Sequence, residues 1–255
     1  MIKLAVPQNP MYDRFVANSE HLIADGSVQI IRDTESKCTK LVKTNIVSAA
    51  FLSPLGYGSG IPAADFRIIP GPCLSAEAYT EIAGLYFNSG LKTLETLATN
   101  SKDDFIAIIG LLLLAEKYSL EPELKEQSGS PAKLLAMYDS AITLGKITDM
   151  PAPLDVTEEW FDAFELELPI GMWVSKSEEL PHNIVETISE IAGDIPLYED
   201  VFESDSSLRA EEHRQGRIKM LWNEDTEHAL EQALQFLYFH QYINEIPAVK
   251  VLGRD

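Results

Sequence analysis

The amino-acid sequence predicts an α/β fold in which sheets are flanked by helices. Short apolar runs that end at proline, glycine or polar residues alternate with stretches long enough for helices. Hydrophobic residues make up 45% of the 255 residues and aromatic residues 9%, so the chain can bury a full core. This length allows one large domain or two of moderate size.

Strands are expected mainly in the first 100 residues. Each apolar run there is short and is followed by turn-forming residues, which is typical of buried strands. In particular, Pro70-Gly71-Pro72 is expected to close the fourth run. The expected strands are 2–6, 28–32, 46–52, 66–69 and 83–88.

The rest of the chain is expected to contain more helix. The apolar run 105–115 has 11 residues between charged residues, so it predicts a buried helix, 105–118, and not a membrane span, which needs about 20. Thr157 and Asn223 are expected to cap two helices. The acidic, serine-rich stretch 194–207 is expected to be a loop. Further helices are expected at 131–138, 157–164 and from Pro181 to about 192, with strands at 141–144 and 170–174.

The charge of the chain excludes several kinds of partner. There are 40 Asp and Glu against 20 Lys and Arg, which gives a formal charge of −20. Nucleic acids and anionic membrane surfaces both attract clustered Lys and Arg, so neither is an expected partner. The acids are concentrated after residue 100, where 31 acids stand against 12 bases. An anionic ligand therefore needs local donors that outweigh this field.

The sequence lacks the short motifs of several common enzyme classes. It has no G-x-x-x-x-G-K-[ST] loop, no G-x-G-x-x-G turn, no G-x-S-x-G elbow and no H-E-x-x-H pair. The five histidines and two cysteines fall at no metal-ligand spacing, so no metal and no cofactor are expected. The N-terminal apolar stretch is too short for a signal peptide, and a cytoplasmic location is expected.

Polar turns at the ends of the expected strands are the candidate binding residues, because α/β sheets hold ligands at the carboxyl ends of their strands. The free N–H groups at the start of the long helix could also bind a carboxylate. Ordinary capping and turn formation is the competing interpretation. The candidates are Gln8 and Asn9, Ser53, the stretch from Ser75 to Thr80, and Asn100 with Ser101.

Several motifs, taken in order, resemble one known family. The first group is Ser53-Pro54-Leu55-Gly56-Tyr57, Phe66-Arg67-Ile68-Ile69-Pro70-Gly71 and Leu114-Ala115-Glu116-Lys117-Tyr118. The second is Asp155-Val156-Thr157-Glu158-Glu159-Trp160, followed by Trp173. From residue 2 to about residue 192 the chain resembles the menaquinone-biosynthesis family that includes chorismate dehydratase.

The resemblance implies a two-lobed periplasmic-binding-protein-like fold of type II, with mixed sheets flanked by helices and a ligand cleft between the lobes. One lobe would comprise 1–82 and 178–255 and the other 83–177, with crossings near 83–88 and 170–176. The implied reaction removes water from chorismate to give 3-enolpyruvylbenzoate, at the entry of the futalosine route, without metal or redox cofactor. The expected partner is a small carboxylate in the cleft of a monomer or homodimer.

The resemblance also implies roles for residues of this chain. Asn9, displaced by one residue from the family's Asn, and Thr80 would polarise the substrate. Other residues would contact the ligand, several of them near its carboxylates. This ligand-binding set comprises Ser53, Asn100, Ser101 and Lys146, near the carboxylates, and Gly145, which precedes Lys146. The strand-end turns add Gln8 and Ser75 to the set, and Tyr57 is added as an aromatic side chain that could stack on a ring.

The chain departs from the family pattern at three places. Ile82 stands where the family has a Ser, which makes Thr80 the nearest hydroxyl. At the start of the long helix, Asp103 and Asp104 would repel a bound carboxylate if they pointed inward. Lys146 stands where the family has an Asp.

Two other functions stay open. The departures also fit a protein that keeps the cleft and binds a small aromatic or carboxylated molecule without converting it. A later enzyme of the same route, 1,4-dihydroxy-6-naphthoate synthase, shares the fold. Its family has a His in the strand-end motif of the second lobe, where this chain reads Thr143-Leu144-Gly145-Lys146, so this function ranks below the other two.

Overall fold

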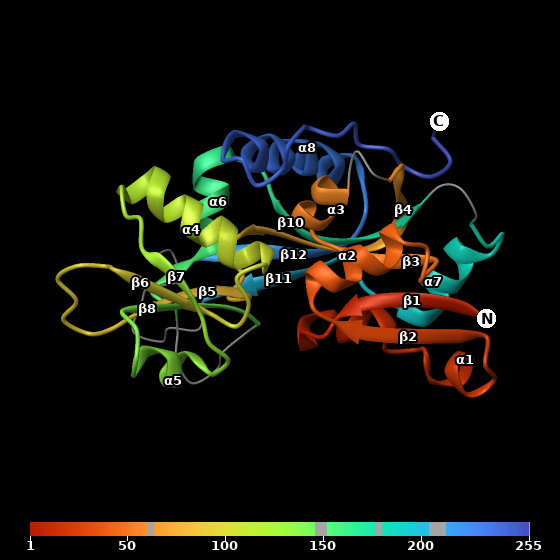
Figure 1. Cartoon of the computed structure of the whole chain (residues 1–255), viewed down its shortest axis with the longest axis horizontal. Coiled ribbons are helices and arrows are strands. Elements are labelled where there is room, and N and C mark those ends of the chain that lie inside the picture. The colour runs from red at the N-terminus through yellow and green to blue at the C-terminus, as the bar shows by residue number, and fades with distance from the viewer. Residues whose placement is uncertain (61–63, 146–151, 177–179, 204–212, 255) are drawn as a thin grey trace. The chain divides into compact units, whose positions relative to one another are not determined.

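The computed structural model describes residues 1–60, 64–145, 152–176, 180–203 and 213–254 (Figure 1). The strands are β1 (Ile2–Pro7), β2 (Val28–Asp33), β3 (Ala49–Leu52), β4 (Phe66–Ala78), β5 (Ala83–Phe87), β6 (Thr96–Thr99), β7 (Glu123–Glu126), β8 (Ser140–Leu144), β9 (Leu154–Asp155), β10 (Leu168–Lys176), β11 (Tyr198–Phe202) and β12 (Gln215–Leu221). The helices are the 3-10 helix η1 (Pro10–Val16), α1 (Glu20–Ala24), α2 (Glu35–Lys43), α3 (Pro54–Gly60), α4 (Phe105–Tyr118), α5 (Pro131–Leu135), α6 (Val156–Phe164), α7 (Ile184–Ala192) and α8 (Glu224–Phe239). This mixture confirms the predicted α/β class.

The chain forms two compact units, each built from separate segments. Unit 1 comprises Met1–Ser75, Leu168–Glu199 and Lys219–Asp255, and unit 2 comprises Ala76–Glu167 and Asp200–Ile218. These bounds differ from the expected lobes of 1–82 with 178–255 and 83–177. One reason is that β10 pairs with β3 of unit 1. Another is that Gln215, at the start of β12, accepts a backbone hydrogen bond from Tyr79 of unit 2 at 3.4 Å.

A seven-stranded sheet has the strand order β11-β12-β4-β10-β3-β1-β2. β1 pairs in parallel with β2 on one side and with β3 on the other, whereas β10 runs antiparallel to β3. From β1 the chain therefore goes first to the β2 side and then returns to the β3 side. Between β1 and β3 the strand order reverses, and such a switch point is where open α/β sheets bind ligands.

Helices of unit 1 cover the sheet around this switch point. Because the connections from β1 to β2 and from β2 to β3 run in opposite directions, their helices lie on opposite faces. α2 packs against β1 and β3, and α8 packs against α3 and β10 (Figure 1). On the η1 side, Phe51 of β3 stacks with Phe15 at 4.8 Å between ring centroids and meets Trp173 of β10 edge-on at 5.4 Å. Burial of these rings fixes η1 directly after the end of β1.

Unit 2 contains a five-stranded sheet of order β7-β6-β8-β5-β9. β6 is parallel to β7 and β8, whereas β5 is antiparallel to β8 and β9. α4 packs against α6 and β8, and it buries residues on most of its circumference, which explains its nearly uniform apolar sequence. Gly110 permits this close approach, because a Cβ there would lie 2.2 Å from Cδ1 of Ile142 in β8.

The course of β4 corrects one prediction. The strand continues through Pro70, Gly71 and Pro72, which are predicted to close it. Gly71 has a φ of 137°, which only glycine adopts readily, and its carbonyl accepts a hydrogen bond from Trp222 N at 2.8 Å. Pro70 and Pro72 have no backbone N–H to donate to a neighbouring strand, so hydrogen bonds to carbonyls, such as this one, keep β4 in the sheet here.

Other elements also differ from their predictions. The stretch 194–207 is predicted to be a loop, but it contains the strand β11. Pairing with β12 makes this segment a strand despite its polar composition. α6 is capped by Asp155, whose side chain accepts from Thr157 N, so Thr157 is not the cap. α7 begins at Ile184 and not at Pro181. The sequence gives no prediction for β6, β7, β9 and β12.

Candidate functional site

The switch point of unit 1 brings together polar residues predicted from the sequence. β1 and β3 are aligned with Ala5 opposite Ala50, so Gln8 and Ser53 stand level, three residues beyond that pair. Asn9 follows Gln8 and begins η1. The carboxyl ends of two parallel strands therefore present Gln8, Asn9 and Ser53 at one edge of the sheet.

Two of these three residues also cap helices, as the competing interpretation expects. The Asn9 Oδ1 accepts a hydrogen bond from Met11 N at 2.9 Å, and the Ser53 Oγ accepts one from Gly56 N at 3.3 Å. Ser53 is buried, whereas Gln8 is exposed. Capping uses the acceptor of Ser53 and leaves its O–H to donate elsewhere.

Arg32 is a further residue at this edge, and the sequence-based candidates do not include it. It stands next to the end of β2, opposite Val6 of β1. Its guanidinium donates to the Pro7 carbonyl at 3.0 Å and pairs with Asp13 at 2.7 Å. Its place near the end of the expected strand 28–32 is the signal that could have identified it.

The basic side chains at this edge are matched by neighbouring acidic ones. Lys37 pairs with Asp33 at 3.1 Å, and the Tyr12 hydroxyl donates to Glu35 at 3.4 Å. The Thr34 N–H and Lys37 lower the pKa of Asp33 below its usual value. The two cations, Arg32 and Lys37, are both paired, so the edge offers hydrogen-bond donors more than net positive charge.

Two predicted ligand contacts lie inside unit 1 instead. Tyr57 has no exposed surface; its hydroxyl donates to the Ala248 carbonyl at 3.1 Å and accepts from Lys250 N at 3.2 Å. Ser75 also has no exposed surface, and its hydroxyl donates to the Leu168 carbonyl at 3.2 Å. Both side chains join chain segments that are far apart in sequence.

The start of α4 in unit 2 does not present its free N–H groups to an anion. Asp104 is the N-cap and accepts from Ile106 N at 3.2 Å, and burial raises its pKa from 3.8 to about 6. Asn100 and Ser101 stand before the cap, where the Asn100 side chain accepts from Gly129 N at 3.0 Å. Asp103 is exposed. A carboxylate already occupies this helix end, so it is a poor site for another.

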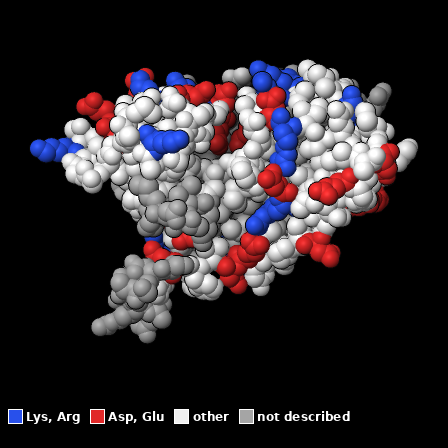
Figure 2. All heavy atoms as spheres, turned by 90° about the horizontal axis from the view of Figure 1, so that it is seen from below, with Lys and Arg blue, Asp and Glu red and all other residues white. Residues whose placement is uncertain are grey.

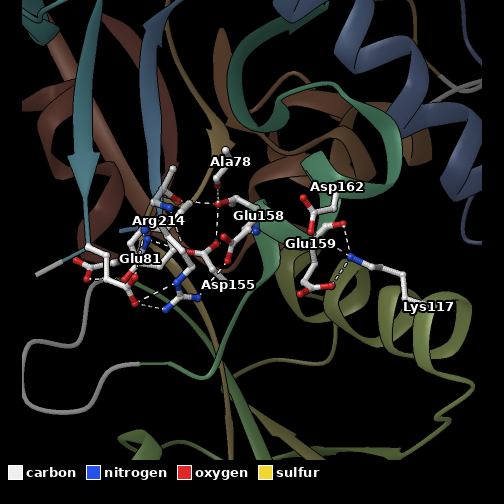
Figure 3. A network of polar contacts seen from close by, with 12 residues as sticks. Ala78, Glu81, Lys117, Asp155, Glu158, Glu159, Asp162 and Arg214 are labelled. Carbon is white, nitrogen blue, oxygen red and sulfur yellow. Dashed lines mark hydrogen bonds and ion pairs between the residues drawn. The ribbon is translucent and has the colours of Figure 1, made fainter. Parts of the chain in front are cut away.

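Thr80 lies in a buried polar network of unit 2. Its hydroxyl is 2.7 Å from that of Thr157, and its N–H donates to Asp155 at 3.1 Å. Arg214 binds Glu203 and Glu158 next to this network (Figure 3). Thr80 is 1% exposed, so its hydroxyl is engaged with the protein in this structure.

Figure 3 also shows that neighbouring residues of α6 point to different partners. Glu158 points to Arg214, whereas Glu159 pairs with Lys117 at 2.5 Å and accepts from the Tyr118 hydroxyl at 2.8 Å. Glu159 and Tyr118 also line a small apolar pocket between α4 and α6. The polar groups of this pocket are therefore already paired.

The remaining candidates are in the β8 region of unit 2. Gly145 follows β8 with a φ of 123° and donates its N–H to the Ile82 carbonyl at 2.6 Å. Lys146 lies outside the described residues. Gly145 thus forms a turn that requires glycine.

Other site types find no support in the described part of the chain. It contains no group of three His, Cys, Asp or Glu side chains placed to hold a metal ion, and no helix long and apolar enough to cross a membrane. On the face in Figure 2, basic and acidic side chains are interspersed and not gathered into one block of either sign. The formal charge of −20 therefore creates no single charged patch on that face.

No family model and no curated protein sequence matches this chain. Its structure is similar to protein AF1704 from Archaeoglobus fulgidus, with a TM-score of 0.59 at 12% identity over 94% of this chain and 98% of that chain. It is also similar to the alkanesulfonate-binding protein SsuA from Xanthomonas axonopodis pv. citri bound to MOPS, with a TM-score of 0.53 at 9% identity over 97% and 96% of the two chains. A periplasmic substrate-binding protein of an ABC transporter from Coxiella burnetii matches with a TM-score of 0.50 at 12% identity, over 75% of this chain and 91% of that chain. The chain therefore has a two-lobed periplasmic-binding-protein-like fold.

Proposed function

We propose that this protein binds a small organic molecule at the carboxyl edge of β1 and β3 in unit 1. The observation that carries the proposal is the position of Gln8, Asn9 and Ser53 at the ends of the two strands that flank the switch point. Ligand binding by SsuA, and the description of the Coxiella burnetii protein as substrate-binding, support this reading by analogy of fold.

The groups at this edge favour a ligand held by hydrogen bonds. The backbone N–H of Gln8 donates to the Asp33 carbonyl at 2.9 Å, whereas its side-chain amide is exposed and forms no hydrogen bond within the described residues, so that amide can both donate and accept. The Ser53 hydroxyl can donate, and the Arg32 guanidinium is already paired with Asp13. These donors fit a small polar molecule whose hydrogen-bond acceptors are attached to a ring or to a short chain.

Calorimetry with chorismate, MOPS and benzoate as probes tests the proposal. At least one probe should bind, and Gln8→Ala and Ser53→Ala should each weaken it about fivefold or more, the effect of losing one hydrogen bond. Gln29→Ala is the matched control, because Gln29 is exposed on the neighbouring β2, opposite Lys3 and away from the carboxyl edge. Binding that is unaffected by both variants, or absent for all three probes, would contradict the proposal.

A narrower candidate for the same protein is the elimination of water from chorismate. It rests on the sequence resemblance and on the contact of Thr80 with Thr157, which belongs to one of the resembling motifs. In this reaction Asn9 and Thr80 would polarise the substrate, and the protein would orient it and exclude water.

Incubation with chorismate, followed by chromatography for 3-enolpyruvylbenzoate, tests this candidate. Product should form, and Thr80→Val should abolish it while the chain still folds. Chorismate that is bound but stays intact would identify the protein as a binder and not a lyase.

A further inference from the structure

The link between β4 and β5 has an unusual backbone. Ala78 has a φ of 58° and Glu81 a φ of 60°, and neither residue is glycine. In this left-handed region a Cβ crowds the following carbonyl, so both residues are strained. Strain of this kind persists only where surrounding contacts enforce it, and it is common in segments that switch conformation.

The carboxylate of Asp155 supplies those contacts. Its Oδ2 accepts hydrogen bonds from Thr80 N at 3.1 Å and Glu81 N at 2.5 Å. Its Oδ1 accepts from Thr157 N at 2.9 Å and lies 2.7 Å from the Thr157 hydroxyl. Asp155 is 1% exposed, and among the described residues it forms no ion pair with Lys or Arg. Both of its oxygens are therefore engaged in ordering the link and the start of α6.

Thr157 extends the same set of contacts. Its hydroxyl lies 2.7 Å from the Ala78 carbonyl and 2.7 Å from the Thr80 hydroxyl. The Thr157 side chain thus contacts the first strained residue, the centre of the link and Asp155.

A second layer holds the side chains of the link. The Tyr79 hydroxyl donates to Glu81 at 2.8 Å, and the Arg214 guanidinium lies 4.3 Å from the centroid of the Tyr79 ring. Arg214 is in turn bound by Glu203 at 2.6 Å and Glu158 at 3.1 Å. These contacts fix side chains. The backbone N–H groups of Thr80 and Glu81 are received by Asp155, and that of Tyr79 by the Gln215 carbonyl at 3.4 Å.

We propose that Asp155 is a positioning residue that holds the β4–β5 link in its strained conformation and sets the direction of the Thr80 hydroxyl. Without the carboxylate, the link relaxes to a second conformation in which Ala78 and Glu81 leave the left-handed region. This role does not depend on the proposed ligand site, because every contact that carries it lies within unit 2.

Amide hydrogen exchange in the full chain tests the proposal. In Asp155→Asn the side-chain amide keeps the shape but turns one acceptor into a donor that faces backbone N–H groups. The amides of Thr80 and Glu81 should then exchange at least tenfold faster, while amides of β8 such as Ile142 keep their rates. Ala78→Gly, added to Asp155→Asn, should restore part of the protection because glycine relieves the strain.

Asp139→Asn is the matched control. The Asp139 carboxylate accepts from Glu95 N at 3.1 Å and Thr96 N at 2.9 Å in the same unit, but it is remote in sequence from the link. The Asp139→Asn variant should leave the exchange rates of the Thr80 and Glu81 amides unchanged.

A second pair of variants covers the case in which Asp155→Asn does not fold. Thr157→Val replaces only the hydroxyl, with a methyl group, and should speed exchange at Thr80, whereas Thr157→Ser should behave like the wild type. Unchanged exchange at Thr80 and Glu81, or an equal acceleration in the link and in β8, would overturn the proposal.

Discussion

The N-cap of α4 offers a stability test with a defined sign. Asp104 caps this helix through Ile106 N, yet burial raises its pKa from 3.8 to about 6. The folded protein therefore holds a proton on Asp104 more tightly than the unfolded chain does. The stability that this tighter proton binding contributes is fully present below about pH 4, and it is lost as the pH rises through 6. At neutral pH the ionised side chain destabilises the fold.

Asp104→Asn should remove this cost, because Asn caps helices as well as Asp does. An upward shift from 3.8 to about 6 corresponds to ~3 kcal/mol of stability lost at full ionisation. Asp104 is half-buried, so solvent screening reduces this value. We expect the free energy of unfolding at pH 7.5 to rise by about 1–2 kcal/mol, and the gain to vanish near pH 4.

Urea unfolding at pH 4.5 and pH 7.5, followed by Trp fluorescence, measures the effect. Trp160 is a suitable reporter, because it lies in α6, which packs against α4. Asp103→Asn is the control, since Asp103 is adjacent but exposed. The reasoning fails if Asp104→Asn is no more stable than Asp103→Asn at pH 7.5, or if its gain is the same at both pH values.

Three further substitutions test the packing described above. Tyr57→Phe should lower the free energy of unfolding by about 1–3 kcal/mol, because it removes the two hydrogen bonds that join this buried side chain to the backbone of Ala248 and Lys250; denaturant titration measures this. Gly216→Ala should lower the melting temperature of unit 2, because the new Cβ would lie 2.3 Å from the Tyr79 carbonyl oxygen. Asn223→Ala should cost about 1 kcal/mol by thermal unfolding, because the Asn223 side chain accepts from Thr226 N at 2.9 Å as the N-cap of α8.

The sequence predicts elements well where local pattern and burial agree. β1 and α4 are found within one residue of their predicted bounds, because a short apolar run before Pro7 and an apolar run between charged residues each have one favourable structure. The polar turns after β1 and β3 were predictable for the same reason. A strand end is visible in the sequence, and Gln8, Asn9 and Ser53 follow directly.

Prediction fails where a partner far along the chain determines the structure. β11 is a strand because it pairs with β12, and β4 crosses two prolines because Gly71 still bonds to Trp222. Tyr57 belongs to a recognisable motif, but only the fold shows that its hydroxyl binds the backbone near residues 248–250 and not a ligand.

The sequence by itself therefore determined the α/β class, the buried helix α4 and the polar ends of two strands. Each of these depends on neighbouring residues and on hydrophobic periodicity. Only the tertiary structure decided that β1 and β3 flank a switch point, that Arg32 stands at the same edge already paired with Asp13, and that Asp155 binds Thr80, 75 residues away in the chain. Local preferences do not encode these contacts, because they form only when packing brings distant segments together.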